Sequence, residues 1–371
     1  MNWPVFTACT AGLVAILVSV DWGGGMSSAE PVLTSQTAPN ATASDSTAAA
    51  PASPTLIAPS VALADGKTDG WVVPDVDKLP DDAWGRIVRF GRELTVATYA
   101  YVGPEVADPA HRFAGTNMSC QSCHLEAGTK KFGLPFVGIF ADFPQYRSRE
   151  GEVGTLEDRI NGCMTRSMNG RPFPVDSAEM KAFVAYIKFL STGRPIGAKT
   201  PGRGSGQIAE LTRPADSVAG SKIFAKTCAA CHGNDGEGKR AGSAGDMKGY
   251  EFPPLWGKDS FNDGAGMARL IAAANFIHSN MPNGTTYDQP TLSVEEAWDV
   301  AAYVDSMNRP QKAHLDDDFP VRTEKPVDAG YPPYIDDFGV QAHKLGPFGP
   351  IRDRLRAIKK ADVEATKSPT K

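Results

Sequence analysis

Cysteine is scarce in this sequence, and no apolar run is clearly long enough to cross a bilayer. The 371 residues include six cysteines, too few for a disulfide scaffold. Neither charge dominates, because 38 basic residues stand against 43 acidic ones, so we expect no binding to nucleic acid. Hydrophobic residues make up 41% of the chain, which is enough to build the cores of two or three soluble domains.

The N-terminal part of the chain carries targeting and linker signals. Residues 1–20 hold no charged side chain, and the apolar run 5–20 suits a secretion signal but is short for a membrane span of roughly 20 residues. We predict a signal peptide over residues 1–29, which would remove Cys9, and a periplasmic protein. A retained membrane anchor is the alternative, because no Lys or Arg lies near the N-terminus. Residues 30–66 are mostly Ala, Ser, Thr and Pro, which predicts a disordered linker.

Two similar units are expected after this linker. Apolar residues at helical spacing begin after Trp71, and a helix capped by Asp176 and Glu179 closes the first unit. A helix with a Ser293/Glu296 capping box closes the second. We predict an N-terminal domain at 67–199, a linker at 200–214, a C-terminal domain at 215–312, and an extended arm at 313–371 that is disordered at its end.

Four cysteines form two C-x-x-C-H strings, Cys120-Gln-Ser-Cys123-His124 and Cys228-Ala-Ala-Cys231-His232. Such a string attaches a c-type haem through two thioether bonds, and its histidine ligates the iron. A zinc site would place the two strings about 15 to 20 residues apart, and a thioredoxin-like motif would lie in a βαβ pattern. The strings are about a hundred residues apart, and neither lies in such a pattern. The sequence therefore predicts two covalently bound haem c groups in an all-α fold of two tandem class I-like cytochrome c domains.

The sixth ligand of each iron decides between an electron carrier and a catalyst. For the second iron the candidate is Met281, which precedes a proline and the closing helix. Met247 and Met267 are rivals. His278 could also ligate, although we interpret it as an exposed loop residue. The first domain has no comparable methionine-proline pair, so its sixth ligand must be sought elsewhere.

The remaining cysteine, Cys163, lies on a predicted short helix that begins at Thr155 and ends near Gly170. Arg159, Cys163 and Ser167 are four residues apart and share one face of this helix. The neighbouring stripe is apolar and consists of Leu156, Ile160 and Met164. A guanidinium on the same face favours the thiolate over the thiol.

The residues of this helix allow more than one role. Cys163 could ligate the first iron or be a small core residue, and Met164 or Met168 could ligate that iron instead. Arg159 could bind an anion or pair with the acidic residues just before it. Further cations lie nearby in the sequence: Lys130, Lys131, Arg147 and Arg149.

At these residues the chain resembles the dihaem thiosulfate dehydrogenases, exported bacterial enzymes that form tetrathionate. The resemblance covers the chain from about Trp71 to Ile351. The stretches that carry it are CQSCHLEAGT, FGLPFVGIFADFPQYRSREG, TLEDRINGCMTRSMNGRPFP, CAACHG, FIHSNMPNG, KPVDAGYPPY and HKLGPFGPI.

The resemblance implies one catalytic haem and one electron-exit haem. Their axial ligands would be His124 with Cys163, and His232 with Met281. The groups that bind thiosulfate would be Arg149, Arg159 and Ser167. Some relatives carry an alternative lysine ligand just before the methionine, where this chain has Asn280.

The implied reaction joins two thiosulfate ions into tetrathionate and releases two electrons, and the same site could also reduce tetrathionate. The implied electron partner is a small soluble cytochrome c or a high-potential iron–sulfur protein. Two alternatives compete with this function. One is a non-catalytic dihaem electron-transfer cytochrome, and the other is a haem–thiolate subunit of a sulfur-oxidising complex.

Overall fold

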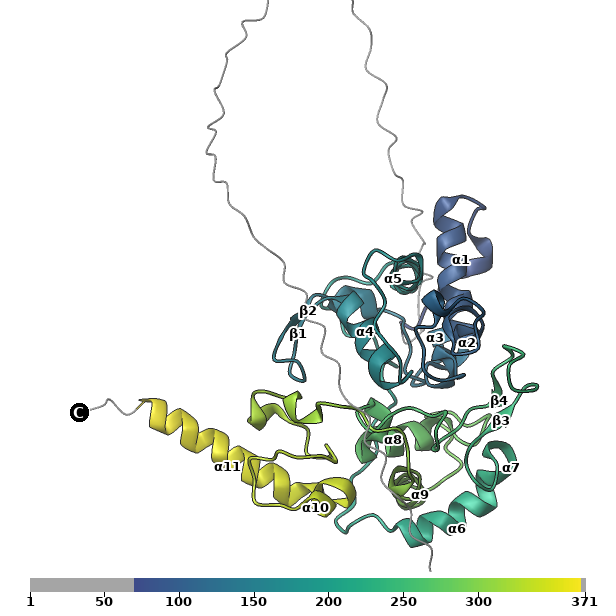
Figure 1. Ribbon diagram of the computed structural model, residues 1–371. Coiled ribbons are helices and arrows are strands. Elements are labelled where there is room, and N and C mark those ends of the chain that lie inside the picture. Colours follow the sequence, from purple (N-terminus) through teal and green to yellow (C-terminus); the bar gives the residue numbers. More distant parts are fainter. Residues whose placement is uncertain (1–69, 368–371) are drawn as a thin grey trace, which may run out of the picture. The chain divides into compact units, whose positions relative to one another are not determined.

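The computed structural model describes residues 70–367, so the predicted signal peptide and the 30–66 linker lie outside the described residues. Helices dominate this part of the chain, together with two short antiparallel hairpins (Figure 1), in agreement with the predicted all-α class. The α-helices are α1 (Ala83–Val96), α2 (Thr98–Val102), α3 (Leu125–Gly128), α4 (Leu156–Arg166), α5 (Ala178–Leu190), α6 (Ser217–Thr227), α7 (Ala229–His232), α8 (Leu270–Asn280), α9 (Val294–Ser306), α10 (Val340–Leu345) and α11 (Phe348–Lys367). The strands are β1 (Gln145–Arg147), β2 (Glu152–Gly154), β3 (Lys239–Arg240) and β4 (Tyr250–Phe252).

The helices α1 to α5 form a first unit, in which α1 packs against α5. α1 begins after Asp82, whose carboxylate accepts a hydrogen bond from Gly85 N at 2.7 Å. α5 begins after Ser177, whose hydroxyl accepts from Met180 N. The predicted cap at Asp176 is therefore wrong by one residue, because only the residue directly before the helix places its side chain near the third helical amide.

The helices α6 to α9 form a second unit, in which α6 and α8 both pack on α9. The predicted capping box at the start of α9 is confirmed, since Ser293 and Glu296 each accept a hydrogen bond from the other's backbone N–H. Trp298 of α9 is buried, and its indole N–H donates to Ala209 O of the segment before α6. The buried side of α9 therefore holds both α8 and the incoming chain.

One glycine in each unit permits the main helix crossing. A Cβ atom at Gly91 of α1 would lie 2.1 Å from Ala182 O of α5, and one at Gly220 of α6 would lie 1.9 Å from Asp299 O of α9. Both distances are too short for any real Cβ atom, so each crossing requires glycine. The two units thus repeat the same close backbone contact, as expected for two copies of one fold.

The segment after α9 runs against both units before it ends in two helices. Phe319 N donates to Arg149 O of the first unit, and Ala215 N donates to Leu345 O at the end of α10. Phe348 and Ile351 of α11 are buried against Trp298 of the second unit. The sequence analysis missed α10 and α11, although the apolar spacing of Phe348, Ile351 and Leu355 is helical.

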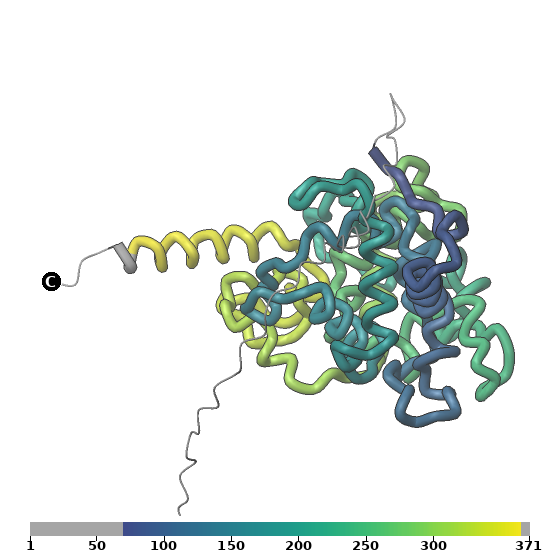
Figure 2. Tube along the Cα trace, turned by 90° about the horizontal axis from the view of Figure 1, so that it is seen from above, coloured from purple at the N-terminus to yellow at the C-terminus, as the bar shows by residue number. Residues whose placement is uncertain are grey.

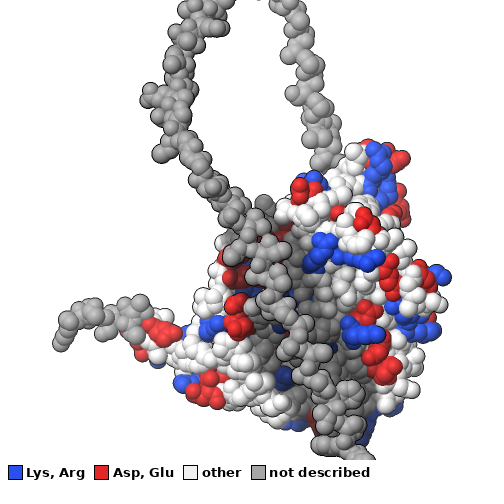
Figure 3. Space-filling model, in the orientation of Figure 1, with Lys and Arg blue, Asp and Glu red and all other residues white. Residues whose placement is uncertain are grey.

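The far half of α11 projects away from the other described residues in both ribbon and tube views (Figures 1 and 2). On the face shown in Figure 3, side chains of both charges are interspersed, without one large patch of either sign. No helix within residues 70–367 combines the length and the apolar character needed to span a membrane.

Candidate functional site

The first C-x-x-C-H string lines a pocket that also contains the candidate face of α4. Cys120, Cys123 and His124 contribute one wall, and Arg159, Cys163 and Ser167 contribute another. Apolar side chains complete the pocket: Met118, Phe136, Ile139, Leu156, Ile160, Met164, Met168, Phe183 and Ile187. The structure therefore brings together these six predicted polar residues from two separate segments of the first unit.

α4 holds its polar face in place through its N-terminus. Thr155 and Asp158 form a capping box, and Leu156, Ile160 and Met164 are buried in the core as predicted. α4 ends at Arg166 rather than near Gly170, and Ser167 is its C-cap residue. The side chains of the polar face are thereby directed into the pocket while the apolar stripe anchors the helix.

Cys163 has the surroundings of a thiolate. Burial alone would raise the pKa of Cys163. Arg159 and His124 oppose this effect and outweigh it, so the pKa falls to about 6. Arg159 Nη1 lies 2.7 Å from Cys163 Sγ, which is a charge-assisted hydrogen-bond distance. Arg159 lines the pocket together with Cys163, and it is an exposed residue. Arg159 is thus directed at Cys163, while the carboxylate of Asp158 accepts from Thr155 N.

The other two thiols of the pocket differ sharply from Cys163. Burial raises the pKa of both Cys120 and Cys123 to about 12, so these thiols are neutral. Cys120 N donates to Thr98 Oγ1 at 3.0 Å, which fixes the start of the string against α2. One pocket therefore contains two neutral thiols in an attachment motif and one stabilised thiolate.

The donor atoms fit a haem at each string. His124 Nδ1 donates to Leu134 O, and His232 Nδ1 donates to Pro253 O at 2.8 Å. A carbonyl oxygen can only accept, so each imidazole carries its proton on Nδ1 and keeps the Nε2 lone pair for a metal. All five cysteines of the described residues are free, as thioether formation requires. In residues 70–367 no three His, Cys, Asp or Glu side chains converge as they would around a bare metal ion.

The candidates for the second iron's sixth ligand lie in different environments. Met281 follows directly after α8 and is partly buried. Met247 is 40% exposed, and Met267 packs against the cores of both units. The interpretation of His278 as an exposed loop residue is wrong: it lies on α8, it is buried, and burial lowers its pKa.

The predicted arginines at the first haem site occupy two places. Arg159 lines the pocket, whereas Arg149 lies at the contact with the segment after α9, where its guanidinium is 5.7 Å from the Phe319 ring. Burial, and secondarily Arg166, lower the pKa of Arg149. Its Nε atom is buried and lacks a hydrogen-bond partner among the described residues. An orphaned guanidinium N–H of this kind suits an anion.

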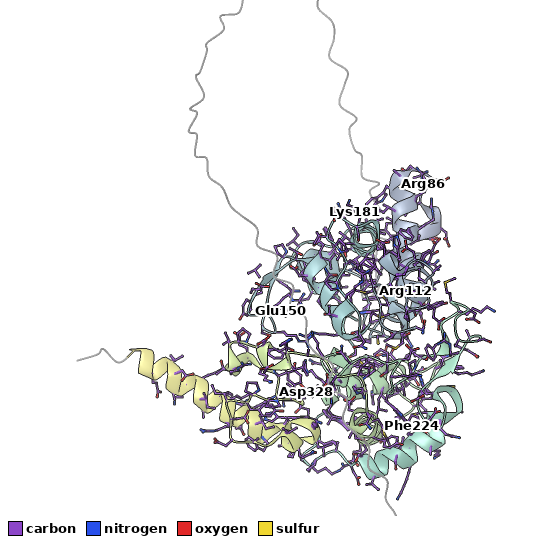
Figure 4. All side chains as sticks on the ribbon, viewed as in Figure 1. Arg86, Arg112, Glu150, Lys181, Phe224 and Asp328 are labelled. Atoms are coloured by element: carbon purple, nitrogen blue, oxygen red, sulfur yellow. The ribbon has the colours of Figure 1, made fainter. Side chains whose placement is uncertain are left out.

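Arg147, which the sequence indicated only as a nearby cation, lies against α4. Its Nη2 is 3.3 Å from the position of a Cβ on Gly162, the residue before Cys163. It donates to Glu150 at 2.8 and 2.9 Å, and its Nη1 is buried without a partner in the described structure. Glu150 also raises the pKa of Arg159, after the larger effect of Cys163. In Figure 4 Glu150 lies at the hairpin next to α4.

A buried ion pair at the end of α4 escaped the sequence analysis. Arg166 donates to both carboxylate oxygens of Asp318, at 2.9 and 2.6 Å, and Tyr331 Oη donates to Asp318 at 2.7 Å. Arg166 also donates to Gly264 O of the second unit. The helix that carries Cys163 is therefore attached both to the second unit and to the segment after it.

Comparisons with known proteins give one consistent result. Residues 111–196 match the family described as "SoxA/TsdA, cytochrome c domain", and residues 217–308 match "Cytochrome c". The chain is 41% identical over 251 residues to a thiosulfate dehydrogenase of Stutzerimonas stutzeri, covering 67% of this chain and 76% of the relative. It is 42% identical over 243 residues to the Allochromatium vinosum enzyme of the same name, covering 64% of this chain and 84% of the relative.

A solved structure supports the same relationship. The thiosulfate dehydrogenase TsdBA of Marichromatium purpuratum superposes with a TM-score of 0.58 at 35% identity, covering 65% of this chain. This chain covers 50% of the Marichromatium purpuratum chain, so the structural similarity concerns that half alone.

Proposed function

Because this chain belongs to the thiosulfate dehydrogenase family, we propose that it is a dihaem cytochrome that oxidises thiosulfate. It carries two haem c groups, one in each unit. When bound, each haem accepts one electron and can pass it on. The thiosulfate chemistry itself belongs to the side chains around Cys163.

We further propose that His124 and Cys163 ligate the first iron and that His232 and Met281 ligate the second. The observation that carries this assignment is the thiolate environment of Cys163, 2.7 Å from Arg159 and in the same pocket as the first attachment string. Met164 and Met168, the rival ligands, are buried core residues that also line that pocket, but each offers only a neutral thioether. A thiolate is the stronger donor and favours a low potential at the first haem, whereas a thioether favours a high one at the second.

The proposed reaction balances in atoms and electrons. The Cys163 thiolate, released from its proposed bond to iron, joins the outer sulfur of one thiosulfate, and a sulfur–sulfur bond forms with the loss of two electrons, which the two haems would take up. A second thiosulfate then attacks the outer sulfur of this adduct, which releases tetrathionate and restores the thiolate. No proton is needed in either step. The same steps in reverse would reduce tetrathionate.

The anionic substrates require fixed positive charge. Two thiosulfate dianions repel each other, and guanidinium groups in a partly dry pocket offset that repulsion more strongly than they would in water. Arg159 can exchange its bond to Cys163 for one to the substrate, and the hydroxyl of Ser167 is a further donor in the same pocket. The partnerless Nε of Arg149 supports a role for that residue at the approach to the site.

The decisive experiment measures tetrathionate formation from thiosulfate with ferricyanide as the sole acceptor. We expect activity in the wild type and its loss in Cys163→Ala, together with loss of a low-spin ferric signal of thiolate character. Full activity in Cys163→Ala would refute the mechanism. Two wild-type haems with His/Met spectra would instead favour an electron-transfer cytochrome.

The assay also tests the sulfur-oxidising-complex alternative, which requires a carrier protein as substrate. The family description of the first unit includes both names, SoxA and TsdA, so that unit alone does not separate them. The second cytochrome unit and the matches over about two thirds of the chain favour the dehydrogenase. We propose a periplasmic location and, as electron partner, a small soluble cytochrome c or a high-potential iron–sulfur protein.

A further inference from the structure

The loop that orients His124 is held by contacts on two sides. This loop, residues 130–134, contains Leu134, whose carbonyl accepts the His124 Nδ1 proton. On one side, carbonyl groups of the segment between the units accept hydrogen bonds from the loop. Phe132 N donates to Gly202 O at 2.6 Å, and Leu134 N donates to Gly204 O at 3.0 Å. The backbone φ angles of Phe132 and Leu134 are +59° and +53°, so the loop adopts a costly conformation that its surroundings must maintain.

On its other side, the loop contacts the second unit next to Met281. Asn280 Nδ2 donates to Phe132 O at 3.0 Å and to Phe276 O at 3.1 Å. Lys130 Nζ donates to Thr285 O at 3.1 Å. The Phe132 and Tyr287 rings contact each other in a tilted arrangement, with their centroids 4.2 Å apart and their planes at 33°. Three contacts from residues 280–287 therefore hold the loop that positions His124.

Asn280 is a destabilising residue at this position. It is 1% exposed, and its Oδ1 atom is buried without a hydrogen-bond partner among the described residues. Leaving a buried acceptor unpaired costs about 1–3 kcal/mol. The oxygen of the Asn280 side-chain amide therefore lowers the stability of the protein. The nitrogen of the same amide donates to Phe132 O.

We propose that Asn280 is a positioning residue that couples the two haem sites, joining the segment of Met281 to the loop that orients His124. The chain of contacts is short: His124 to Leu134 O, then two residues along the backbone to Phe132 O, then Asn280, then its neighbour Met281. This proposal rests on the ligand assignment given under Proposed function. Its consequence is that one hydrogen bond influences the reduction potentials of both haems.

The directions of the two influences follow from ligand chemistry. A firm Nδ1–H bond to a carbonyl makes an imidazole a stronger donor and stabilises ferric iron, so loosening Leu134 raises the potential of the first haem. A firmly held thioether stabilises ferrous iron, so loosening Met281 lowers the potential of the second haem. Loss of the Asn280 donor therefore moves the two potentials toward each other.

The test is a spectroscopic redox titration of the holoprotein that resolves both haems, in wild type and in Asn280→Leu. Leucine keeps the branching and the number of side-chain heavy atoms, and it removes both the donor to Phe132 O and the unpaired oxygen. We expect the first-haem potential to rise, the second-haem potential to fall, and the far-red sulfur-to-iron charge-transfer band of the second haem to weaken. Tyr287→Leu, which removes the ring contact with Phe132 and the hydrogen bond from Tyr287 Oη to Gln207 O but keeps the Asn280 donor, should shift both potentials in the same directions by less.

Asn283→Leu is the matched control, because Asn283 is an exposed asparagine in the same segment. Both of its potentials should equal those of the wild type. A change confined to the second haem in Asn280→Leu would overturn the coupling, as would unchanged potentials at both haems. Absence of the sulfur-to-iron band in the wild type would overturn the Met281 assignment together with the coupling. Thiosulfate oxidation by the wild type is scored separately, so failure of the proposed function is distinguishable from failure of the coupling.

Discussion

The two cytochrome units of this chain share a design and differ in the element from which we propose the sixth iron ligand comes. Each has a glycine at its main helix crossing and a histidine whose Nδ1 donates to a carbonyl. The first unit adds α4, which presents Cys163 and Arg159 to the pocket, whereas the second unit has Met281 at the end of α8. A catalytic and an electron-transfer site can therefore be built on one scaffold by changing the single element that faces the histidine.

The environments of the two units differ in charge as well as in ligand. Around the first site, Arg147 and Arg149 each have a buried guanidinium nitrogen with no hydrogen-bond partner in the described structure. At the second site, burial lowers the pKa of His232, its Nδ1 donates to the Pro253 carbonyl, and its ring lies edge-on to Phe252. Arg147 is paired with Glu150, so Arg149 is the better candidate of the two for contact with an anionic substrate.

The largest effect should come from removing the atom that distinguishes the two units. Cys163→Ala should lower thiosulfate-oxidising activity by about 10⁴-fold, because both the proposed nucleophile and the proposed ligand are lost. Steady-state rates with ferricyanide and electron paramagnetic resonance of the ferric protein give the measurement. Retention of more than a tenth of the wild-type rate would contradict the assignment.

Cys163→Met would make the first unit resemble the second. We expect a higher potential at the first haem and sulfur-to-iron absorption from both haems, with activity as low as in Cys163→Ala. If Cys163→Met remained active, the thiolate would not be the feature that separates the units.

The next largest effect should come from the ion pair between Arg166 of α4 and Asp318 of the segment after α9, and it concerns the free energy of unfolding. Asp318→Ala leaves Arg166 buried without its carboxylate and should lower the free energy of unfolding by about 3–5 kcal/mol. Denaturant unfolding followed by circular dichroism provides the measurement. Asp353→Ala is the control, since the Asp353 side chain is 69% exposed and pairs with Arg356 on the surface; its loss should cost less than about 1 kcal/mol. Equal losses in the two variants would exclude a special role for Asp318.

The charge beside the thiolate should matter somewhat less than the thiolate itself. Arg159→Met should reduce kcat/KM by roughly 10²–10³-fold, as expected for removal of one fixed group that stabilises developing negative charge. Arg159→Lys should recover part of the lost kcat/KM, because lysine keeps the positive charge but lacks the forked guanidinium donors. Arg354→Met, a change at a half-exposed arginine of α11, should leave kcat/KM unchanged. A similar rate in Arg159→Met and wild type would remove Arg159 from the site.

The shared helix crossings predict the smallest and most symmetrical effects. Gly91→Ala and Gly220→Ala each force a Cβ against a backbone carbonyl, and each should destabilise its own unit by about 1–3 kcal/mol. Thermal unfolding of the holoprotein, followed at the haem absorption, measures both. A much larger loss in one variant would show that the units are less alike in packing than their backbones indicate.

The parts of this protein that could be predicted from the sequence are those encoded locally. The attachment strings, the Thr155 cap of α4 and the Ser293 box of α9 each lie within a few residues, and so does the face of Arg159, Cys163 and Ser167. The parts that could not be predicted join distant residues. Arg166 and Asp318 are 152 positions apart, and no local pattern indicates such a pair.

His278 shows a second kind of failure. Its neighbours near the methionine-proline pair suggested a loop, but α8 continues to Asn280 and buries the imidazole. The burial depends on tertiary packing, which overrides local turn signals. The same limit applies to Asn280, whose importance becomes visible only through its contact with Phe132 of the other unit.

The Arg166–Asp318 pair also has a consequence for the biogenesis of the protein. Synthesis runs from the N-terminus, so both attachment strings and Cys163 exist long before Asp318 and Tyr331 emerge. Until then, the guanidinium of Arg166 at the end of α4 lacks its carboxylate, and the helix that carries the thiolate lacks its outer support. The face that carries Cys163 is thus completed by a segment made well after both attachment strings, so a copy terminated before Asp318 would have both strings without the outer support of α4.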